Sequence, residues 1–401
     1  MTILIADKFP ESGLDRLRQM GLEVVSDPSL KEEALEQVLR ETSAQILVVR
    51  STRVEARHLD ASASLALVIR AGAGVNTIDV EEASRRGIHV ANCPGKNSIA
   101  VAELAFAHLL AMDRRLVDGA LDLRQGRWKK KEYAKARGLY GTTLGLIGMG
   151  RIAQAMVARA HAFGIDVVAW SRSLTPEKAA ELGVEYAASP VAVAERCDAL
   201  SVHLALNDDT QHLVDAEVLA ALPDGALVIN TSRGGVIDQQ ALAQAIETRG
   251  LRAALDVFDG EPSGGDGDIT TDIFSLPGVQ GSHHIGASTA QAQQAVADEV
   301  LRIVQTFESA GDVPNCVNLA DTTPATHLLV VRHRNRVGAL AGVLDVLRGA
   351  EINVQEVENI IFRGAEAASA RLRLDREPDA GVLARVSASS EHVLAVVART
   401  L

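Results

Sequence analysis

The sequence predicts an α/β fold with two doubly wound, parallel-sheet lobes of the Rossmann or flavodoxin type, followed by a small ferredoxin-like domain. Three observations predict it. Short apolar runs alternate with helical patterns through the first 92 residues, and the same alternation starts again at residue 142. The tail after residue 326 changes to a strand–helix–strand–strand–helix–strand pattern.

The first lobe begins with short apolar runs that are separated by segments with helical spacing. Continuous apolar runs of four to eight residues are typical of strands that are buried on both faces of a parallel sheet. The expected strands are 2–7, 22–25, 45–49, 66–71 and 88–92. A long helix is expected from Ser98 to about Arg115. Because it is apolar on most of its circumference, we expect it to be buried between domains.

The second series repeats this alternation and carries a glycine cluster directly after its first strand. The expected strands are 142–148, 165–171, 199–204, 226–230, 253–258 and 279–282. Strands that alternate with helices in this way form parallel sheets covered by helices. A last long helix is expected from Ser288 to about Ala310.

The tail is separated from the rest by a polar, proline-containing linker, "LADTTPAT" (319–326). About 75 residues with a βαββαβ pattern follow, which is the size of one small ferredoxin-like domain.

Composition excludes several classes of protein. The 401 residues are 47% apolar and 23% charged, which is typical of globular domains. A formal charge of −12 disfavours nucleic acid as a partner. Three distant cysteines suit a reducing compartment and form neither a disulfide framework nor a metal motif. Without a signal-like start or a long apolar run, we expect a cytoplasmic protein with no membrane partner.

The glycine cluster "GLIGMGRIAQ" suits the phosphates of a dinucleotide. Gly148 allows a tight turn after the strand, Gly150 allows a pyrophosphate to approach the backbone, and Ala153 replaces the third glycine of the usual motif. A helix that begins here offers free N–H groups and a partial positive charge to an anion. Because a strand precedes the motif and a helix follows it, we interpret it as a dinucleotide-binding turn.

The second strand of this unit ends in "AWSRS", without the acid that commonly binds the adenosine ribose of NAD. Ser171 does not repel a 2′-phosphate, and Arg172 could pair with one. Alternatively, Arg172 is a solvated surface charge and NAD binds. NAD and NADP therefore both remain open.

Three candidate catalytic residues follow strands of the second sheet: Arg233, Glu261 and His284. Ligands gather at the carboxyl ends of parallel strands. Histidine suits proton transfer near neutral pH, a neighbouring carboxylate favours the imidazolium, and a guanidinium can bind a substrate carboxylate through two hydrogen bonds. Each residue also has a structural interpretation, and the adjacent His283 is an alternative to His284.

Several of these motifs resemble those of a known family. "GLIGMGRIAQ", "INTSRGGVIDQQALAQAI", "AALDVFDGEP" and "HHIGASTAQAQ" resemble the D-isomer-specific 2-hydroxyacid dehydrogenases, and "VVRSTRV", "VIRAGAGVNTIDVEEASRRGIHVANCPGKNS" and "VAELAFAHLLAMDRR" extend the likeness over most of the first 320 residues. The tail makes the chain most similar to the phosphoglycerate-oxidising members, which carry an ACT regulatory domain.

The resemblance implies a role for each catalytic candidate: Arg233 binds the substrate carboxylate, Glu261 partners the histidine, and His284 transfers the proton. His284, and not His283, falls in the "HIGAST" pattern; His283 stands where the family often has proline. The family pattern further implies cofactor contacts from Asp256, which would hold the nicotinamide carboxamide, from Thr231, and from the backbone of Gly148, Gly150, Arg151 and Ile152.

The resemblance also implies a domain division. It predicts a discontinuous substrate-binding domain of residues 1–94 and 286–319, a dinucleotide-binding Rossmann domain of 95–285, and an ACT domain of 326–401. The substrate would lie between the first two.

A substrate phosphate requires positive charge. Arg50 and Arg70 each end a predicted strand, and "RWKKK" (127–131), with Lys130 at its centre, supplies further cations. The lysine run could equally be a solvated loop. Ser51, Gly74 and Val75 match the substrate-contacting loops of the family.

In the tail, "HRNRVG" resembles the effector loop of ACT domains. His333, Asn335 and Asn353 match positions that bind serine in relatives with end-product inhibition, although Val337 replaces the usual proline. Alternatively, the domain only stabilises an oligomer. Because such a site forms between subunits, we expect a homodimer or homotetramer in either case.

The expected activity is oxidation of 3-phospho-D-glycerate to 3-phosphohydroxypyruvate, the first step of L-serine biosynthesis, with no metal ion. One alternative is an NAD(P)H-dependent glyoxylate or hydroxypyruvate reductase, which "WSRS" favours. An alternative of another class is an NADH-sensing corepressor-like binding protein.

Overall fold

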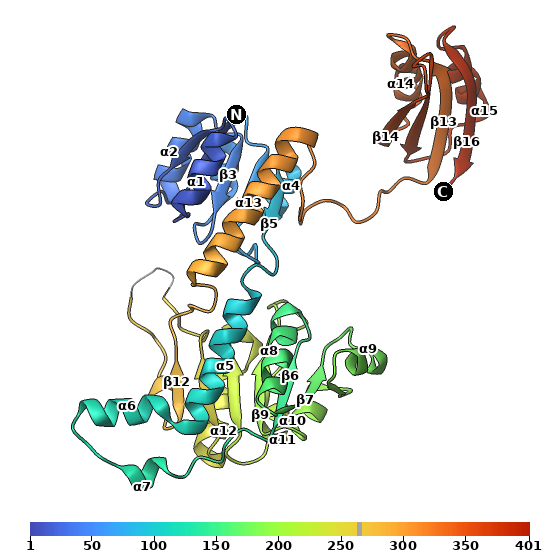
Figure 1. Cartoon of the computed structure of the whole chain (residues 1–401). Coiled ribbons are helices and arrows are strands. Elements are labelled where there is room, and N and C mark those ends of the chain that lie inside the picture. Colours follow the sequence, from blue (N-terminus) through green and yellow to red (C-terminus); the bar gives the residue numbers. More distant parts are fainter. Residues whose placement is uncertain (263–266) are drawn as a thin grey trace. The chain divides into compact units, whose positions relative to one another are not determined.

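The computed structural model describes residues 1–262 and 267–401. The chain divides into two compact units, Met1–Asn318 and Leu319–Leu401 (Figure 1).

The first unit contains two parallel sheets. The sheet nearer the N-terminus has five strands in the order β2-β1-β3-β4-β5, and every neighbouring pair is parallel. Its strands are β1 (Thr2–Ile5), β2 (Glu23–Ser26), β3 (Ile46–Val49), β4 (Leu67–Arg70) and β5 (His89–Asn92). Helices α1 (Glu11–Gln19), α2 (Glu32–Thr42), α3 (Ala56–Asp60) and α4 (Val80–Arg85) connect them. Residues of β1 and β3 are completely buried, as expected for a sheet covered on both faces.

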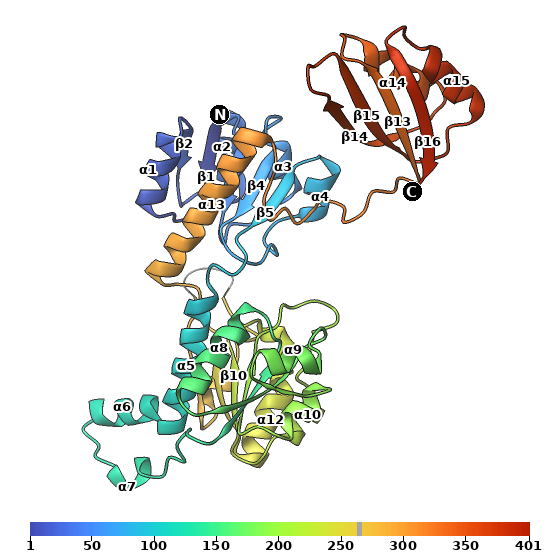
Figure 2. The same cartoon turned by 45° about the vertical axis from the view of Figure 1, so that its right-hand side comes forward.

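A helix from the far end of the unit completes this first core. Helix α13 (Ala290–Ala310) contacts α1, and its residues Val300 and Val304 are buried in the same apolar cluster as Ile3 and Ile69. Both views show α13 in orange against the blue strands (Figures 1 and 2). The chain therefore leaves this sheet after β5 and returns to it with α13.

The second sheet has seven parallel strands in the order β12-β11-β10-β9-β6-β7-β8. They are β6 (Thr143–Ile147), β7 (Asp166–Trp170), β8 (Glu185–Tyr186), β9 (Ala199–Val202), β10 (Leu227–Asn230), β11 (Arg252–Leu255) and β12 (Val279–Gly281). The order reverses between β6 and β9, which is the place where doubly wound sheets bind ligands.

Helices cover this second sheet. They are α5 (Ser98–Arg114), α8 (Arg151–Ala162), α9 (Pro176–Glu181), α10 (Pro190–Ala194), α11 (Ala216–Ala221) and α12 (Gln239–Arg249), with short 3-10 turns η1 (Gly234–Val236) and η2 (Ile273–Ser275). Helix α5 contacts α8, β10 and β11, and it also contacts α13. Because these elements surround α5, the helix is apolar on most of its circumference and has no single polar face.

Strand β8 and helices α6 (Leu116–Arg124) and α7 (Lys130–Tyr133) are among the elements that were not predicted. Strand β8 has two exposed residues and lies at the sheet edge, so it lacks the apolar run that reveals a buried strand. Helices α6 and α7 form an arm after α5. Leu116, Leu121, Leu123 and Trp128 of this arm are exposed, so its apolar spacing does not mark a face buried within the chain.

The second unit is an antiparallel sheet with helices, in the order β14-β15-β13-β16. Its elements are β13 (His327–Arg334), α14 (Ala339–Gly349), β14 (Val354–Ile361), β15 (Ala367–Leu374), α15 (Ala380–Ala388) and β16 (Val393–Thr400). The predicted α/β class, with two parallel-sheet lobes and a C-terminal antiparallel sheet, is confirmed.

The described helices include none that is both long and apolar enough to cross a bilayer. Nor does the described part of the chain group three or more His, Cys, Asp or Glu residues in a way that could hold a metal ion.

Candidate active site

The three catalytic candidates follow neighbouring strands of the second sheet. Arg233 follows β10, Glu261 follows β11, and His284 follows β12. Because these strands are parallel and adjacent, their carboxyl ends lie at the same edge. The sheet order therefore brings together residues that are up to 51 positions apart.

Glu261 binds His284 directly. The Nδ1 atom of His284 lies 2.8 Å from Oε2 of Glu261, and the other carboxylate oxygen accepts a hydrogen bond from the backbone N–H of Phe258 at 2.8 Å. An ionised carboxylate has no hydrogen to donate and can only accept, so Nδ1 of His284 carries the hydrogen in this bond. Nε2 remains for another partner, and the side chain of His284 is 53% exposed, so a small molecule can reach it.

The backbone of His284 is held in a strained conformation. Its φ of 52° lies in the left-handed region, which costs a non-glycine residue on the order of 1 kcal/mol. Bonds to Asp256 hold the loop: the N–H of His284 donates to the Asp256 carbonyl at 3.0 Å, and the N–H groups of Ile285 and Gly286 donate to its carboxylate at 2.9 Å each. Asp256, predicted to hold the nicotinamide, therefore also anchors the loop that carries His284.

Arg233 extends toward a loop of the first lobe. Its Nη1 donates to the carbonyl of Ser232, and the Asn230 side chain donates to the carbonyl of Arg233 at 2.9 Å. A Cβ atom at Gly74 would lie only 3.2 Å from Nη2 of Arg233. Gly74 of the first lobe, which was predicted to contact the substrate, therefore lies beside Arg233, a catalytic candidate of the second lobe.

Arg70 and Arg50 join Arg233 in a cationic cluster. Burial lowers the pKa of Arg70, and the charges of Arg233 and Arg50 lower it further. The Nε atom of Arg70 is buried without a hydrogen-bond partner among the described residues, and Gly72 lies directly against its guanidinium. Across residues 1–262 and 267–401, none of the three guanidiniums forms a salt bridge with a carboxylate. Positive charge without a directly paired carboxylate suits an anion.

Asp7 organises the loop that follows β3. Its carboxylate accepts hydrogen bonds from the N–H groups of Arg50, Ser51 and Thr52 and from the hydroxyl of Ser51. Burial opposes ionisation of Asp7, but these donors outweigh it and hold its pKa below the usual value. Asp7 was not predicted as a site residue, although its place two residues after the end of β1 was a usable signal.

Val75 lies between β4 and α4, in the loop that also carries Gly74.

The glycine turn has the shape that a phosphate requires. Gly148 has a φ of 93°, and a Cβ atom there would lie 2.4 Å from the carbonyl oxygen of His203. Gly150 is the N-cap of α8, and a Cβ atom there would meet no described residue within 4 Å, so the described structure leaves the space beside it open. Thr231 has a buried hydroxyl without a partner among the described residues. These features fit a dinucleotide.

Arg151 and Ile152 begin helix α8 with different surroundings. Ile152 packs against the apolar cluster below the sheet. Nη1 of Arg151 donates to the carbonyl of Pro94 at 3.0 Å, in the segment where the chain passes from the first lobe to the second.

Ser171 and Arg172 follow β7, as predicted. Arg172 is not a free cation, because its Nη1 lies 2.8 Å from a carboxylate oxygen of Asp209. Both side chains are highly exposed, so the pair is weak and a phosphate could compete for the arginine. Asp209 was missed because it lies 37 residues away in a loop.

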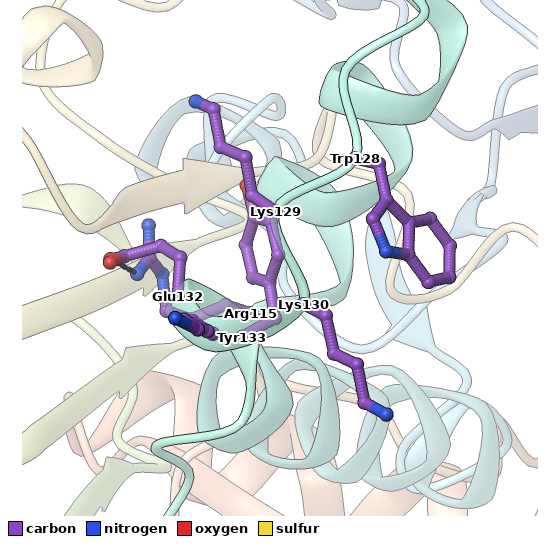
Figure 3. Close-up of a pocket in the computed structure, with 7 residues that line it drawn as sticks. Arg115, Trp128, Lys129, Lys130, Glu132 and Tyr133 are labelled. Atoms are coloured by element: carbon purple, nitrogen blue, oxygen red, sulfur yellow. Dashed lines mark hydrogen bonds and ion pairs between the residues drawn. The ribbon is translucent and has the colours of Figure 1, made fainter.

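Lys130 is not brought together with the other predicted substrate contacts. It starts α7, and its neighbours in a cavity of about 720 Å³ all belong to the arm: Arg115, Trp128, Lys129, Lys131, Glu132 and Tyr133 (Figure 3). Buried Asp122 holds this arm together, because it accepts hydrogen bonds or ion pairs from Arg127, Lys129 and Tyr133. Within one chain, Lys130 therefore belongs to a separate surface.

The three effector candidates do not form one cluster within a chain. His333 pairs with Ala368, whereas Asn353 precedes Val354, which pairs with Leu374 at the other end of β15. Six residues of strand separate the two positions by roughly 20 Å. His333 is also buried, with its ring nitrogens near Arg334 O and Asn359 Oδ1. A site containing all three residues requires a second copy of the chain.

Sequence comparison identifies the family. Residues 106–297 match the family described as D-isomer specific 2-hydroxyacid dehydrogenase, NAD binding domain. The chain is 34% identical over 325 residues to a glyoxylate reductase from Thermococcus litoralis, which covers 79% of this chain and 96% of that protein. The chain belongs to the D-isomer-specific 2-hydroxyacid dehydrogenase family.

Other members of this dehydrogenase family are similar as well. A D-3-phosphoglycerate dehydrogenase from Methanocaldococcus jannaschii is 37% identical over 323 residues, and the match spans 79% of this chain but only 60% of that protein. Among solved structures, an NADPH-dependent glyoxylate/hydroxypyruvate reductase from Sinorhizobium meliloti, in complex with NADP and malonate, superposes with a TM-score of 0.65 at 30% identity, covering 79% of this chain and 96% of that one. Substrate names thus differ within the family.

Proposed function

We propose that this dehydrogenase oxidises 3-phospho-D-glycerate to 3-phosphohydroxypyruvate. The observation that carries the proposal is the cluster of Arg50, Arg70 and Arg233, which lacks carboxylate partners in the described part of the chain. A substrate with one carboxylate needs one guanidinium. A further dianionic phosphate accounts for the other two charges. The similarity to proteins named D-3-phosphoglycerate dehydrogenase supports the same choice.

In the proposed reaction, each catalytic residue has one task. Arg233 binds the substrate carboxylate and orients C2. The Nε2 atom of His284 takes the proton of the C2 hydroxyl, while Glu261 holds Nδ1 and stabilises the imidazolium that forms. A bound nicotinamide would supply the hydride acceptor. In the reverse direction His284 returns the proton to the carbonyl oxygen.

We propose that the cofactor lies along the glycine turn. Gly148, Gly150 and the N–H groups of Arg151 and Ile152 would hold its pyrophosphate, because they begin a helix beside open space. Thr231 and Asp256 would contact the nicotinamide end. Ser171 and Arg172 would face the adenosine ribose, and they permit either NAD or NADP.

The domain assignment follows the same proposal. Residues 1–94 and 286–319 would form the substrate-binding domain, 95–285 the dinucleotide-binding domain, and 326–401 an ACT domain. L-serine would bind between the ACT domains of two chains through His333, Asn335 and Asn353. The exposed apolar residues of the α6–α7 arm support an oligomer.

A second candidate is reduction of glyoxylate or hydroxypyruvate with NADPH. Ser171 at the ribose position favours it, since no acid repels a 2′-phosphate. The solved relative that binds NADP is named for this activity.

Steady-state kinetics on the full chain distinguish the candidates. The experiment compares kcat/KM for 3-phosphoglycerate and D-glycerate with each cofactor, and for hydroxypyruvate and glyoxylate in the reverse direction. We expect loss of the phosphate to lower kcat/KM by at least about a hundredfold, because two charge-assisted contacts are lost. Equal efficiency on D-glycerate would reject the phosphoglycerate proposal. No turnover on any of these acids, combined with NADH-dependent capture of a protein, would favour a corepressor.

A further inference from the structure

A buried path of hydrogen bonds links helix α5 to the loop that carries His284. Nε2 of His108, on α5, lies 2.9 Å from Oγ of Ser282, and this hydroxyl donates to Oδ1 of Asp256 at 2.6 Å. On the other side of the ring, Nε2 of Gln280 lies 3.3 Å from Nδ1 of His108. His108 and Asp256 are only 7% and 1% exposed. His108 and Asp256 therefore lie in the interior of the second lobe, and Ser282 and Gln280 between and beside them are partly buried.

The Asp256 carboxylate determines which atom donates the hydrogen in each bond of this path. A carboxylate only accepts, so the hydroxyl hydrogen of Ser282 points to Asp256. The hydroxyl oxygen then accepts a hydrogen bond from the ring, which places a hydrogen on Nε2 of His108. Nδ1 is left as an acceptor for the amide N–H of Gln280. This assigns neutral His108 with its hydrogen on Nε2, and burial supports the assignment because it lowers the pKa of His108 against the opposing charge of Asp256.

The Asp256 carboxylate connects this path of hydrogen bonds to the loop that carries His284. Its Oδ1 accepts from both Ser282 and Ile285, and its Oδ2 accepts from Gly286. These bonds hold the two residues that follow His284, whose own backbone is strained at φ 52°. A strained residue persists only where its surroundings over-determine it. Rotation of the Asp256 carboxylate would release that constraint.

We propose that His108 and Ser282 are positioning residues for the proton-transferring histidine, acting through Asp256. This role rests on the proposed function of His284. The three residue types also occur in hydrolase triads, but the connectivity here is different. The carboxylate accepts from the serine instead of binding the imidazole, and Nε2 of His108 already carries a hydrogen, so no base is placed to activate the Ser282 hydroxyl as a nucleophile.

Three substitutions at His108 separate the hydrogen bond from packing. His108→Gln can place an N–H at the position of Nε2, His108→Asn places its amide at the level of Nδ1, and His108→Leu removes both polar atoms. We expect kcat to fall by about tenfold or more in the leucine and asparagine variants, with KM for the hydroxy acid little changed, because the Arg cluster is untouched. The glutamine variant should retain most of the wild-type kcat.

Substitutions at Ser282 test the same path independently. Ser282→Ala breaks the path, and Ser282→Thr keeps the hydroxyl. If the two residues act as one unit, adding His108→Leu to Ser282→Ala should lower kcat no further. Wild-type kcat in His108→Leu, or equal losses in its glutamine and leucine variants, would overturn the proposal.

Amide hydrogen exchange tests the path without substrate. In the full chain, the peptide 282–288 should exchange faster in His108→Leu and His108→Asn than in wild type, and as slowly as wild type in His108→Gln. Unchanged exchange in all variants would reject the path even if the enzyme turns over phosphoglycerate. The predicted exchange pattern would support it even if no hydroxy acid is a substrate.

Discussion

Glu261 and His284 form a hydrogen bond of 2.8 Å between Oε2 and Nδ1, although 23 residues separate them. The second oxygen of Glu261 is bound to the backbone of Phe258, so the carboxylate cannot rotate freely. The pair leaves Nε2 of His284 for the substrate. This arrangement is the basis of the first prediction.

His284→Asn should lower kcat by orders of magnitude while the dissociation constant of the nicotinamide cofactor stays nearly unchanged, because the ring transfers a proton and does not anchor the cofactor. Glu261→Gln should cause a smaller loss of kcat, since the ring remains but its protonated form loses a charged partner. Steady-state kinetics and fluorescence titration with NADH check both. Wild-type turnover in His284→Asn would remove this residue from the mechanism.

Two glycines of the nucleotide turn should respond differently to alanine. At Gly150, a Cβ meets no atom of the described residues within 4 Å, so Gly150→Ala should keep the thermal midpoint and weaken cofactor binding by obstructing the pyrophosphate. At Gly148, a Cβ would lie 2.4 Å from the carbonyl oxygen of His203, and φ is positive, so Gly148→Ala should also lower the midpoint. Calorimetry and cofactor titration test the pair. Unchanged cofactor affinity in Gly150→Ala would place the pyrophosphate elsewhere.

Cofactor preference should depend on Ser171. Ser171→Asp introduces a carboxylate that repels a 2′-phosphate, so the ratio of kcat/KM for NADP to that for NAD should fall. Asp209→Asn serves as the companion variant, because it frees Arg172 from an exposed ion pair worth about 0–1 kcal/mol. It should raise the ratio by no more than about fivefold. A ratio that Ser171→Asp leaves unchanged would show that this residue does not face the ribose.

Arg70→Met should affect activity and stability in opposite directions. The kcat/KM for phosphoglycerate should fall by about 10- to 100-fold, which corresponds to one lost charge-assisted hydrogen bond. The free energy of unfolding should rise, because a half-buried guanidinium with no carboxylate partner among the described residues, beside Arg50 and Arg233, is removed. Kinetics and urea unfolding measure the two effects. An unchanged kcat/KM would exclude Arg70 from the substrate site.

Glu299 should make folding sensitive to acid. Hydrogen bonds from Arg302 lower its pKa from 4.5 to about 2 against the opposing effect of burial, and Lys96 and Asn315 contribute further. A lowered pKa in the folded state stabilises the protein above pH 4.5, and this contribution is lost as pH falls from 4.5 toward about 2. Urea unfolding between pH 6 and 3 should therefore show a shallower pH dependence in Glu299→Gln than in wild type. Parallel curves would contradict this assignment.

Much of the fold was predictable because its signals are local. Each buried parallel strand needs a continuous apolar run, so all strands of the first sheet and all but β8 of the second were recognisable, and β8 escaped because its two residues are exposed. The turn at Gly148 and Gly150 was predictable because the backbone geometry of a phosphate-binding turn demands glycine. Helix α6 was missed because its residues Leu116, Leu121 and Leu123 are exposed in the single chain, and α7 was missed because it has only four residues.

The sequence by itself determined which strand each catalytic candidate follows, because strand ends are set by local composition. Only the tertiary structure decided which side chains meet. Arg233 lies against the loop that carries Gly74, and Arg172 forms an ion pair with Asp209. Lys130 contacts only residues of the α6–α7 arm in its cavity. His108 is linked to Asp256 through Ser282. The physical reason is that these contacts depend on strand order and on the two crossings between lobes, and neither leaves a periodic signal in the chain.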